Sequence, residues 1–133
     1  MTKKHVMAIS YQPKIEPVKD GRCTQTIRKG HRVDVGDEIL FHGWVGRPYR
    51  SKWNWRLRVV VKESIRILIS NTGISFPDKV IKIMWSDHEC AWLAALDFIE
   101  PSTGPALRDV LFKLNGGKPP AESEVHLYQI IRW

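Results

Sequence analysis

The sequence predicts an α+β protein, built as a small β-barrel with two short helices packed beside it. Three observations predict this class: short β-rich segments recur along the chain, two segments near residues 86–114 repeat apolar residues with helical spacing, and the last segment returns to a β pattern. The length fits a single domain over residues 1–133, which is enough to bury a hydrophobic core.

The first half of the chain contains two strand candidates and one segment predicted to be irregular. Residues 5–10 and 38–44 are rich in apolar residues, and the second of these segments follows a Gly-Asp turn at 36–37. Residues 11–21 contain two prolines, which interrupt hydrogen-bonded structure. We therefore predict a loop there that crosses to the next element.

The second half continues with β-rich segments. Residues 57–69 alternate apolar with mostly polar positions, which predicts one long strand or a bent pair with one buried face. An Asn-Thr-Gly turn at 71–73 precedes another apolar strand candidate at 80–85. Residues 125–133 are predicted to form the C-terminal strand.

Two helices are predicted between these strands. The first follows a capping box in which Ser86 is the N-cap and Glu89 reaches back to it. The second begins near residues 103–105, with a proline in its first turn, and repeats leucine and valine with helical spacing. A Gly-Gly pair at 116–117 is expected to end it.

Six tryptophans are many for this length. Those in patterned elements are expected in the core, and they are Trp85, Trp92 and Trp133. Those that flank or occupy a basic segment are Trp44, Trp53 and Trp55. Aromatic rings among cations form a stacking platform for unpaired bases. The alternative is that they anchor a hairpin, and the sequence leaves both interpretations open.

The charge is one-sided along the chain. The net charge is +7, but residues 1–62 hold 14 lysines and arginines against 5 acidic residues, while residues 63–133 hold 7 against 9. A one-sided cationic field attracts phosphate backbones and releases their counterions on binding. A nucleic acid, RNA or DNA, is therefore a candidate partner, although a merely basic protein would show the same charge. An anionic membrane is not expected, because no basic amphipathic helix is present.

The cysteines and the N-terminus indicate a cytoplasmic protein. Cys23 and Cys90 form no close pairing motif, which suits a reducing compartment and argues against a disulfide framework. The N-terminal residues lack the apolar stretch of a signal peptide, and no apolar run approaches the ~20 residues that span a bilayer.

Three consecutive residues of types that bind metals stand at His88, Glu89 and Cys90. The later Pro-Cys-x-x-Cys that zinc deaminases require is absent, as are the His-Glu-x-x-His, P-loop and nucleophile-elbow motifs. We therefore expect neither a metal nor another cofactor, and Glu89 is better explained as a helix cap.

The densest hydrogen-bonding chemistry lies in residues 23–39. Within it, Thr24, Gln25, Thr26 and Arg28 supply hydroxyl, amide and guanidinium groups over a short span. In an extended segment, Thr24, Thr26 and Arg28 share one face. That face could hold a phosphate, a carbonyl or a base edge, and an ordinary solvated loop is the alternative.

The stretch GRCTQTIRKGHRVDVGDEILFHGW at residues 21–44 resembles the signature of the ASCH superfamily, which is related to PUA-like β-barrels. In that family a Gly-Arg-Lys-Thr-x-Thr-Ile-Arg type of segment is followed by a Gly-Asp turn and a strand. The matching positions are Gly21, Arg22, Thr24, Thr26, Ile27, Arg28, Gly36 and Asp37. The terminal Ile-Ile-Arg-Trp is similar to that of short phage and bacterial members. The resemblance implies a PUA-like barrel, a cleft between barrel and helices, and a role with RNA or modified nucleosides.

One branch of the family, the bacterial N4-acetylcytidine amidohydrolases, uses a lysine, a threonine and a glutamate. By this resemblance the threonine is Thr26, the lysine position falls on Cys23, and the acid falls near Asp97. A thiol supplies no permanent cation, and a neighbouring guanidinium is a poor proton shuttle. Cys23 would itself be a nucleophile if Arg22 and Arg28 depressed its pKa. Loss or change of the hydrolase activity is the favoured interpretation.

The preferred hypothesis is an RNA-binding module, non-catalytic or weakly catalytic, that recognises RNA or a modified nucleoside in a basic cleft. The residues expected to contact it are Arg22, Thr24, Thr26, Arg28, Lys29, Arg32, Arg47, Tyr49, Arg50, Lys52 and Trp53. The alternative is a small hydrolase that acts on an acylated nucleoside, or a ribonuclease, with Cys23, Thr26 and Asp97 as its catalytic groups. A third possibility is an accessory protein that binds an acidic protein partner.

Overall fold

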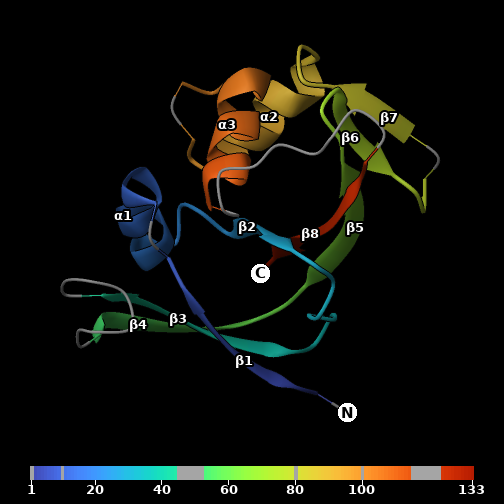
Figure 1. Ribbon diagram of the computed structural model, residues 1–133. Coiled ribbons are helices and arrows are strands. Elements are labelled where there is room, and N and C mark those ends of the chain that lie inside the picture. Colours follow the sequence, from blue (N-terminus) through green and yellow to red (C-terminus); the bar gives the residue numbers. More distant parts are fainter. Residues whose placement is uncertain (1, 10, 45–52, 80, 100, 115–123) are drawn as a thin grey trace.

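The computed structural model describes residues 2–9, 11–44, 53–79, 81–99, 101–114 and 124–133, with only the backbone described at positions 12, 44, 54 and 114. Over these residues the protein is α+β, as predicted, with eight strands in two sheets and three helices. In Figure 1 a three-stranded sheet forms the lower part of the molecule, helices α2 and α3 lie at the top, and α1 lies at the side between these levels.

The three-stranded sheet has the order β1-β3-β4. Strand β1 (Lys4–Ala8) runs parallel to β3 (Glu38–Trp44), and β3 pairs antiparallel with β4 (Trp53–Val60). Strands β1 and β3 confirm the two strands that were predicted at residues 5–10 and 38–44. The β3–β4 register shifts at Gly43/Trp44, which marks a bulge near the end of the pair.

The five-stranded sheet has the order β2-β8-β5-β6-β7, and every pair in it is antiparallel. Its members are β2 (Gln25–Lys29), β8 (His126–Arg132), β5 (Glu63–Ile69), β6 (Gly73–Phe76) and β7 (Ile81–Met84). In the described part of the chain the two sheets do not close on each other, so a barrel is not confirmed.

The predicted segment 57–69 is a bent pair, and its two strands belong to different sheets. The chain leaves β4 and enters β5 through Val61 and Lys62. The backbone N–H of Val61 donates to the carbonyl of Asp37 at 2.9 Å, and its carbonyl accepts from the N–H of Gly36 at 2.9 Å. These two bonds hold the crossing point against the turn that precedes β3.

The segment predicted as a loop at residues 11–21 forms helix α1 (Gln12–Asp20), so that prediction was wrong. Pro13 lies in the first turn, where the helix requires no amide donor. Gly21 then ends the helix in the left-handed conformation, at φ +88°. Pro17 removes one internal hydrogen bond, and packing of the apolar face of α1 on the core offsets that loss.

Helices α2 (His88–Leu96) and α3 (Gly104–Leu114) confirm the two predicted helices. The predicted capping box is wrong, because the N-cap residue is Asp87 rather than Ser86. The Asp87 carboxylate instead accepts a hydrogen bond at 2.7 Å from the backbone N–H of Met84, which ties the start of α2 to the end of β7.

Two of the three expected core tryptophans pack on the core. Trp85 is buried, and Trp133 is half-buried with its ring centroid 4.7 Å from that of Phe41. Trp92 is 61% exposed, which contradicts the prediction. The buried face of α2 is formed by residues three and four apart, beginning at Cys90, and position 92 points away from that face.

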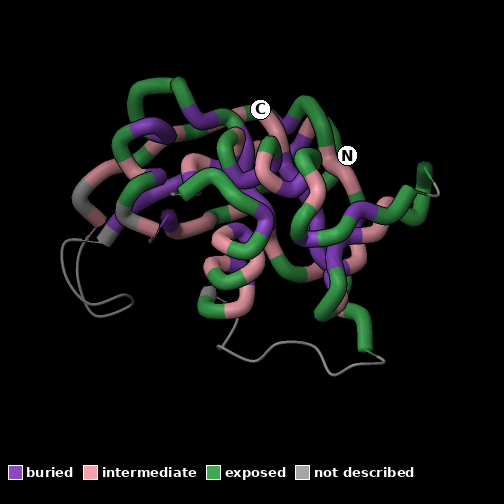
Figure 2. Tube along the Cα trace, turned by 90° about the horizontal axis from the view of Figure 1, so that it is seen from above, coloured by how far each residue is buried: buried purple, intermediate pink, exposed green. Residues whose placement is uncertain are grey.

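Each sheet has its own hydrophobic core. The larger cluster lies between the five-stranded sheet and helices α2 and α3, and it includes Ile67, Leu107 and Tyr128. The smaller cluster joins the inner face of the three-stranded sheet to α1 and to Ile131 of β8. Figure 2 shows the buried segments through the middle of the molecule and the exposed ones around its margin.

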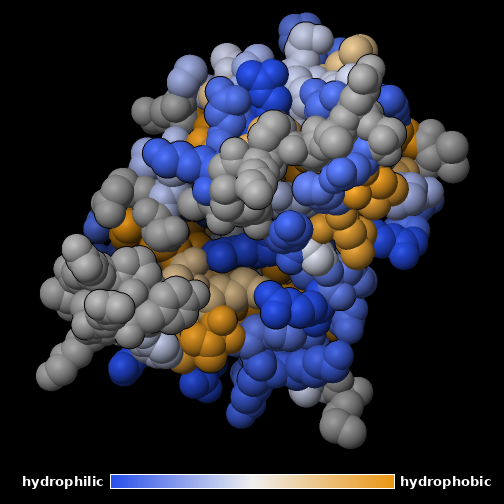
Figure 3. All heavy atoms as spheres, viewed as in Figure 1, coloured by the Kyte–Doolittle hydropathy of each residue, from blue (hydrophilic) through white to orange (hydrophobic). Residues whose placement is uncertain are grey.

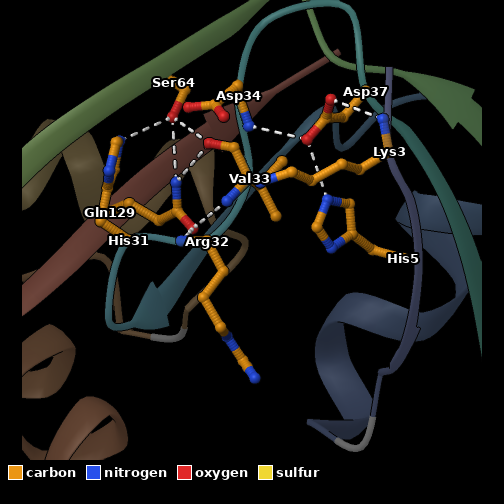
Figure 4. A network of polar contacts seen from close by, with 9 residues as sticks. All are labelled: Lys3, His5, His31, Arg32, Val33, Asp34, Asp37, Ser64 and Gln129. Carbon is orange, nitrogen blue, oxygen red and sulfur yellow. Dashed lines mark hydrogen bonds and ion pairs between the residues drawn. The ribbon is translucent and has the colours of Figure 1, made fainter. Parts of the chain in front are cut away.

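Asp37 ties the N-terminal strand to the turn before β3, as Figure 4 shows. Its carboxylate accepts hydrogen bonds from the backbone N–H of Lys3 at 3.0 Å and of Asp34 at 3.0 Å. His5 Nε2 lies 2.9 Å from the same carboxylate. The two backbone donors, together with His5, hold the pKa of Asp37 far below its usual value.

The neighbouring part of the same figure shows how Gln129 fixes the loop that leads to this turn. Its side-chain oxygen accepts from the N–H groups of Arg32 at 3.1 Å and Val33 at 3.2 Å. Its side-chain nitrogen donates to the Val33 carbonyl and to Ser64 Oγ, both at 2.9 Å. A buried amide whose bonds are all satisfied holds the loop against β8 and β5.

Replacing Asp37 by Asn is expected to lower the melting temperature at neutral pH by several degrees, because a charged acceptor of three hydrogen bonds is lost. Since folding depresses the pKa of Asp37, its stabilisation is present above the unfolded-state pKa of about 3.9 and is lost as the pH falls below that value. The difference in melting temperature between wild type and variant, followed by circular dichroism, should therefore shrink from pH 7 to pH 3. The exposed neighbour Asp34→Asn serves as the control, and an equal loss in that variant would contradict the assignment.

Candidate functional site

A buried lysine, threonine and aspartate meet at one point between α1, β2 and α2. Lys14 Nζ lies 2.9 Å from Asp97 Oδ1 and 3.1 Å from Thr26 Oγ1. The side chains of Lys14 and Asp97 are only 6% and 8% exposed, and Thr26 is 2% exposed. Charged side chains are almost never buried to this degree unless they are paired, and this pair also holds a hydroxyl.

Three separate elements bring these groups together. Lys14 lies in the first turns of α1, and Thr26 is the second residue of β2. Asp97 is the C-cap residue of α2, and its backbone N–H bonds to the Leu93 carbonyl at 3.1 Å. The next residue, Phe98, has a positive φ of 55°, which turns the chain sharply away and leaves the Asp97 carboxylate at the helix end.

Arg28 adds a second cationic donor to the threonine. Its Nε lies 3.2 Å from Thr26 Oγ1, and its Nη2 donates to the backbone carbonyl of Ala8 at 2.7 Å. Thr26 and Arg28 are two residues apart on β2, so they share a face as predicted, whereas Thr24 precedes the strand and is exposed. The hydroxyl oxygen therefore lies between the ammonium of Lys14 and the guanidinium of Arg28.

The side chain of Cys23 does not have the properties of a nucleophile. Cys23 is fully buried, and its thiol donates to the carbonyls of Gln25 at 3.4 Å and Leu96 at 3.6 Å. Burial raises the pKa of Cys23, and the opposing effect of Lys14 is smaller. The shift is thus opposite to the depression by Arg22 and Arg28 that a nucleophilic Cys23 would require. Arg22 instead binds Asp20 at 2.7 Å.

Lys14 was not identified from the sequence. It lies in the segment predicted as a loop, nine residues before the position at which the family resemblance expects a lysine. The available signal was the combination of Pro13 near a helix start and Gly21 near a helix stop, with Lys14 and Val18 four residues apart on one face. Both of these residues are buried in the structure.

Among the described residues, those predicted to bind RNA have different surroundings. Thr24, Lys29 and Arg32 are exposed, while Thr26 and Arg28 belong to the buried group. Arg22 is exposed and paired with Asp20. Four further predicted contacts lie outside the described residues, and they are Arg47, Tyr49, Arg50 and Lys52.

Trp53 lies on β4 and is half-buried. Its ring stacks on that of His42 with a centroid distance of 3.9 Å, and the Arg56 guanidinium lies 5.0 Å from its centroid. Burial, with a smaller effect from the charges of Arg56 and Arg28, lowers the pKa of His42. Trp53 therefore belongs to an aromatic and cationic cluster at one end of the three-stranded sheet.

His88, Glu89 and Cys90 do not form a metal site. The first two are exposed, and Cys90 is buried, which raises its pKa to about 11. Within the described residues no group of three or more potential ligands is close enough to hold a metal ion. Among the described helices, none has the length and apolar character needed to cross a membrane.

Figure 3 shows the face on which α1 lies beside the two sheets. The surface is hollowed between the upper and lower parts of the molecule, and hydrophilic and hydrophobic atoms both line the hollow.

Comparison of the chain with protein-family models, with curated proteins and with solved structures found no match.

The buried ion pair predicts strong thermodynamic coupling. Lys14→Met and Asp97→Asn should each lower the free energy of unfolding by about 3 kcal/mol, because each leaves a buried charge without its partner. The double variant should lose roughly 2 kcal/mol less than the sum of the two, as measured by urea denaturation. Lys19→Met removes the same charge from an exposed pair on the same helix and should cost less than about 1 kcal/mol. Additive losses at Lys14 and Asp97 would contradict the coupling.

Proposed function

We propose that the protein is a hydrolase that removes an acyl group from an N-acylated nucleoside, with Thr26 as the nucleophile, Lys14 as the group that carries the proton and Asp97 as the anionic partner of Lys14. The observation that carries this proposal is the buried contact of Lys14 with both Thr26 Oγ1 and Asp97 Oδ1. A hydroxyl beside a lysine that is in turn oriented by a carboxylate is a recurrent arrangement for covalent catalysis.

The position of Lys14 changes the balance between the two hypotheses drawn from the sequence. The non-catalytic module was favoured because the lysine position of the amidohydrolases falls on Cys23. Lys14 supplies an ammonium group to Thr26 from a different element, and the resemblance to that branch supports the same three residue types. Aspartate stands here where that branch has glutamate, and the carboxylate chemistry is unchanged.

The first half of the reaction forms an acyl-enzyme. For this step the proton that Lys14 and Asp97 share lies on the carboxylate, which leaves Nζ as an amine. Thr26 Oγ then attacks the acyl carbon, the carbonyl electron pair moves to its oxygen, and the hydroxyl proton passes to Nζ. When the C–N bond breaks, the ammonium of Lys14 returns that proton to the departing nitrogen. Asp97, 2.9 Å away, stabilises the ammonium while it carries the proton.

The second half releases the acid. A water oxygen attacks the ester on Thr26, its proton moves to Lys14, and collapse of the intermediate returns that proton to Thr26 Oγ. The net reaction consumes one water and yields a carboxylic acid and an amine. Arg28 Nε, 3.2 Å from Thr26 Oγ1, stabilises negative charge on this oxygen as it loses its proton in the first half and as it leaves the acyl carbon in the second.

The first test is hydrolysis of N4-acetylcytidine, resolved by chromatography as cytidine and acetate. We expect Thr26→Val to lower kcat/KM at least 100-fold, because the nucleophile is lost while the side-chain shape is kept. Lys14→Met should cause a loss of the same order, and Lys19→Met on the same helix should leave the rate within twofold. Circular dichroism would establish that each variant is folded.

The opposite results would reject the proposal. If the wild-type protein releases no cytidine, or if folded Thr26→Val retains activity, Thr26 is not a nucleophile for this substrate. The contact of Lys14 with Asp97 would then serve only to fasten α1 to the end of α2.

Arg28 allows a second prediction that separates catalysis from binding. Arg28→Gln should lower kcat by about 10- to 100-fold with a smaller change in KM, because its donor acts on charge that develops after the substrate binds. Steady-state kinetics with the same substrate would measure this split. A rise in KM at constant kcat would assign Arg28 to ground-state binding instead.

A further inference from the structure

We propose that the outer face of the three-stranded sheet, defined as the surface of β1, β3 and β4 that points away from the core, binds single-stranded nucleic acid. This surface is separate from the Lys14–Thr26–Asp97 site, and the inference does not depend on the proposed hydrolase activity. It is carried by the strand register, by the exposure of the residues on this face, and by their charge.

The register divides the sheet into two faces. On the inner face, Ile39 and Phe41 of β3 are buried in the smaller core. Their partners Met7, Leu57 and Val59 pack on the same cluster. On the outer face, the residues follow in three rows, namely Lys4–Glu38–Val60, Val6–Leu40–Arg58 and Ala8–His42–Arg56. In Figure 1 all three helices lie on the other side of this sheet.

The outer face carries unpaired positive charge. Lys4, Arg56 and Arg58 are exposed, and within the described residues none of them lies in an ion pair. Glu38 is the one carboxylate in the three rows. Arg56 and Arg58 are two residues apart on β4, so their Cα atoms are about 7 Å apart along the strand. Forked guanidinium groups in such a row suit successive phosphates.

The same face also exposes apolar side chains on its two outer strands. Val6 is 59% exposed and Val60 is 54% exposed, while Leu40 between them is half-buried. Exposed apolar side chains on the same face as Lys4 and Arg58 offer contact to bases or sugars in addition to phosphates. At one end, the half-buried ring of Trp53 lies beside His42 and Arg56 and adds an aromatic edge.

These features favour an unpaired strand over other occupants. A paired duplex presents its phosphates outward and keeps its bases stacked inside, so the exposed apolar side chains would have no partner. A second copy of this chain docked face to face would bring the arginines of β4 into a shared, positively charged interface. An anionic membrane would be held by phosphate contacts alone, since short valine side chains on a flat sheet reach little into the lipid.

The test is fluorescence anisotropy with a labelled single-stranded 12-nucleotide RNA, at several salt concentrations. The double variant Arg56→Gln/Arg58→Gln is expected to weaken binding at least tenfold at moderate salt. It should also reduce the slope of log K against log salt by roughly 1.4, about 0.7 for each phosphate contact with a single strand. The matched control is Lys79→Gln/Lys82→Gln, which removes the same charge from exposed residues near β7 and should change binding less than twofold.

Further measurements distinguish a single strand from the other possible occupants of this face. The same RNA annealed to its complement should bind at least fivefold more weakly than the single strand, and Val60→Asp should weaken single-strand binding without changing the melting temperature. Equal losses in the two double variants, equal binding of duplex and single strand, or tighter capture on phosphatidylserine vesicles would overturn the proposal. Hydrolysis of free N4-acetylcytidine by Arg56→Gln/Arg58→Gln should be unchanged, so failure here and failure of the proposed hydrolase give different results.

Discussion

The ion pair between Lys14 and Asp97 is the constraint on which the arrangement of the two halves depends. It lies where α1, the start of β2 and the end of α2 meet, and α2 is far in sequence from the other two elements. Burying both charges carries a desolvation cost that a well-packed apolar pair would avoid, so stability alone does not explain the choice of residues. What the pair supplies is a fixed ammonium group beside the hydroxyl of Thr26, in surroundings where electrostatic interactions are strong.

The remainder of the fold holds this point in place through polar contacts outside the two cores. Asp37 fixes the start of β1, and Gln129 fixes the loop after β2. Both act on backbone N–H groups, so each determines the path of the chain rather than the position of one side chain. Because β1 also supplies the carbonyl of Ala8 that holds Arg28, the network around Asp37 and the cationic environment of Thr26 are linked through a single strand.

Most strands were predictable from apolar or alternating segments, and two of the three helices from spacing and turn signals, whereas β2 and β6 were not predicted. Helix α1 was not, because its two prolines are favourable in a first turn and unfavourable further along, and only tertiary packing decides between them. Because residues 11–21 were predicted to form a loop, Lys14 gave no reason to expect a buried side chain. Thr26 and Asp97 were named from the family resemblance, but their contact through Lys14 depends on three elements whose meeting point local sequence does not encode. Trp92 was expected in the core but is exposed. A helical pattern identifies a helix, but it does not determine which of its large residues faces the core.

The positively charged residues of the first half of the chain lie in two different environments, one largely buried and one exposed to solvent. Lys14 and Arg28 are buried or half-buried beside Thr26, where their charge acts on one oxygen atom. Arg56 and Arg58 project from the opposite side of the three-stranded sheet into solvent, where their charge acts over about 10 Å and weakens with salt. The net positive charge of the chain therefore does not imply that all its basic residues belong to one binding site. The two proposals together restrict the substrate. Because the hydroxyl of Thr26 is buried, only a small acylated base can reach it, and the base must be free to leave its stack. Free nucleosides and strand ends are then better substrates than the interior of a duplex.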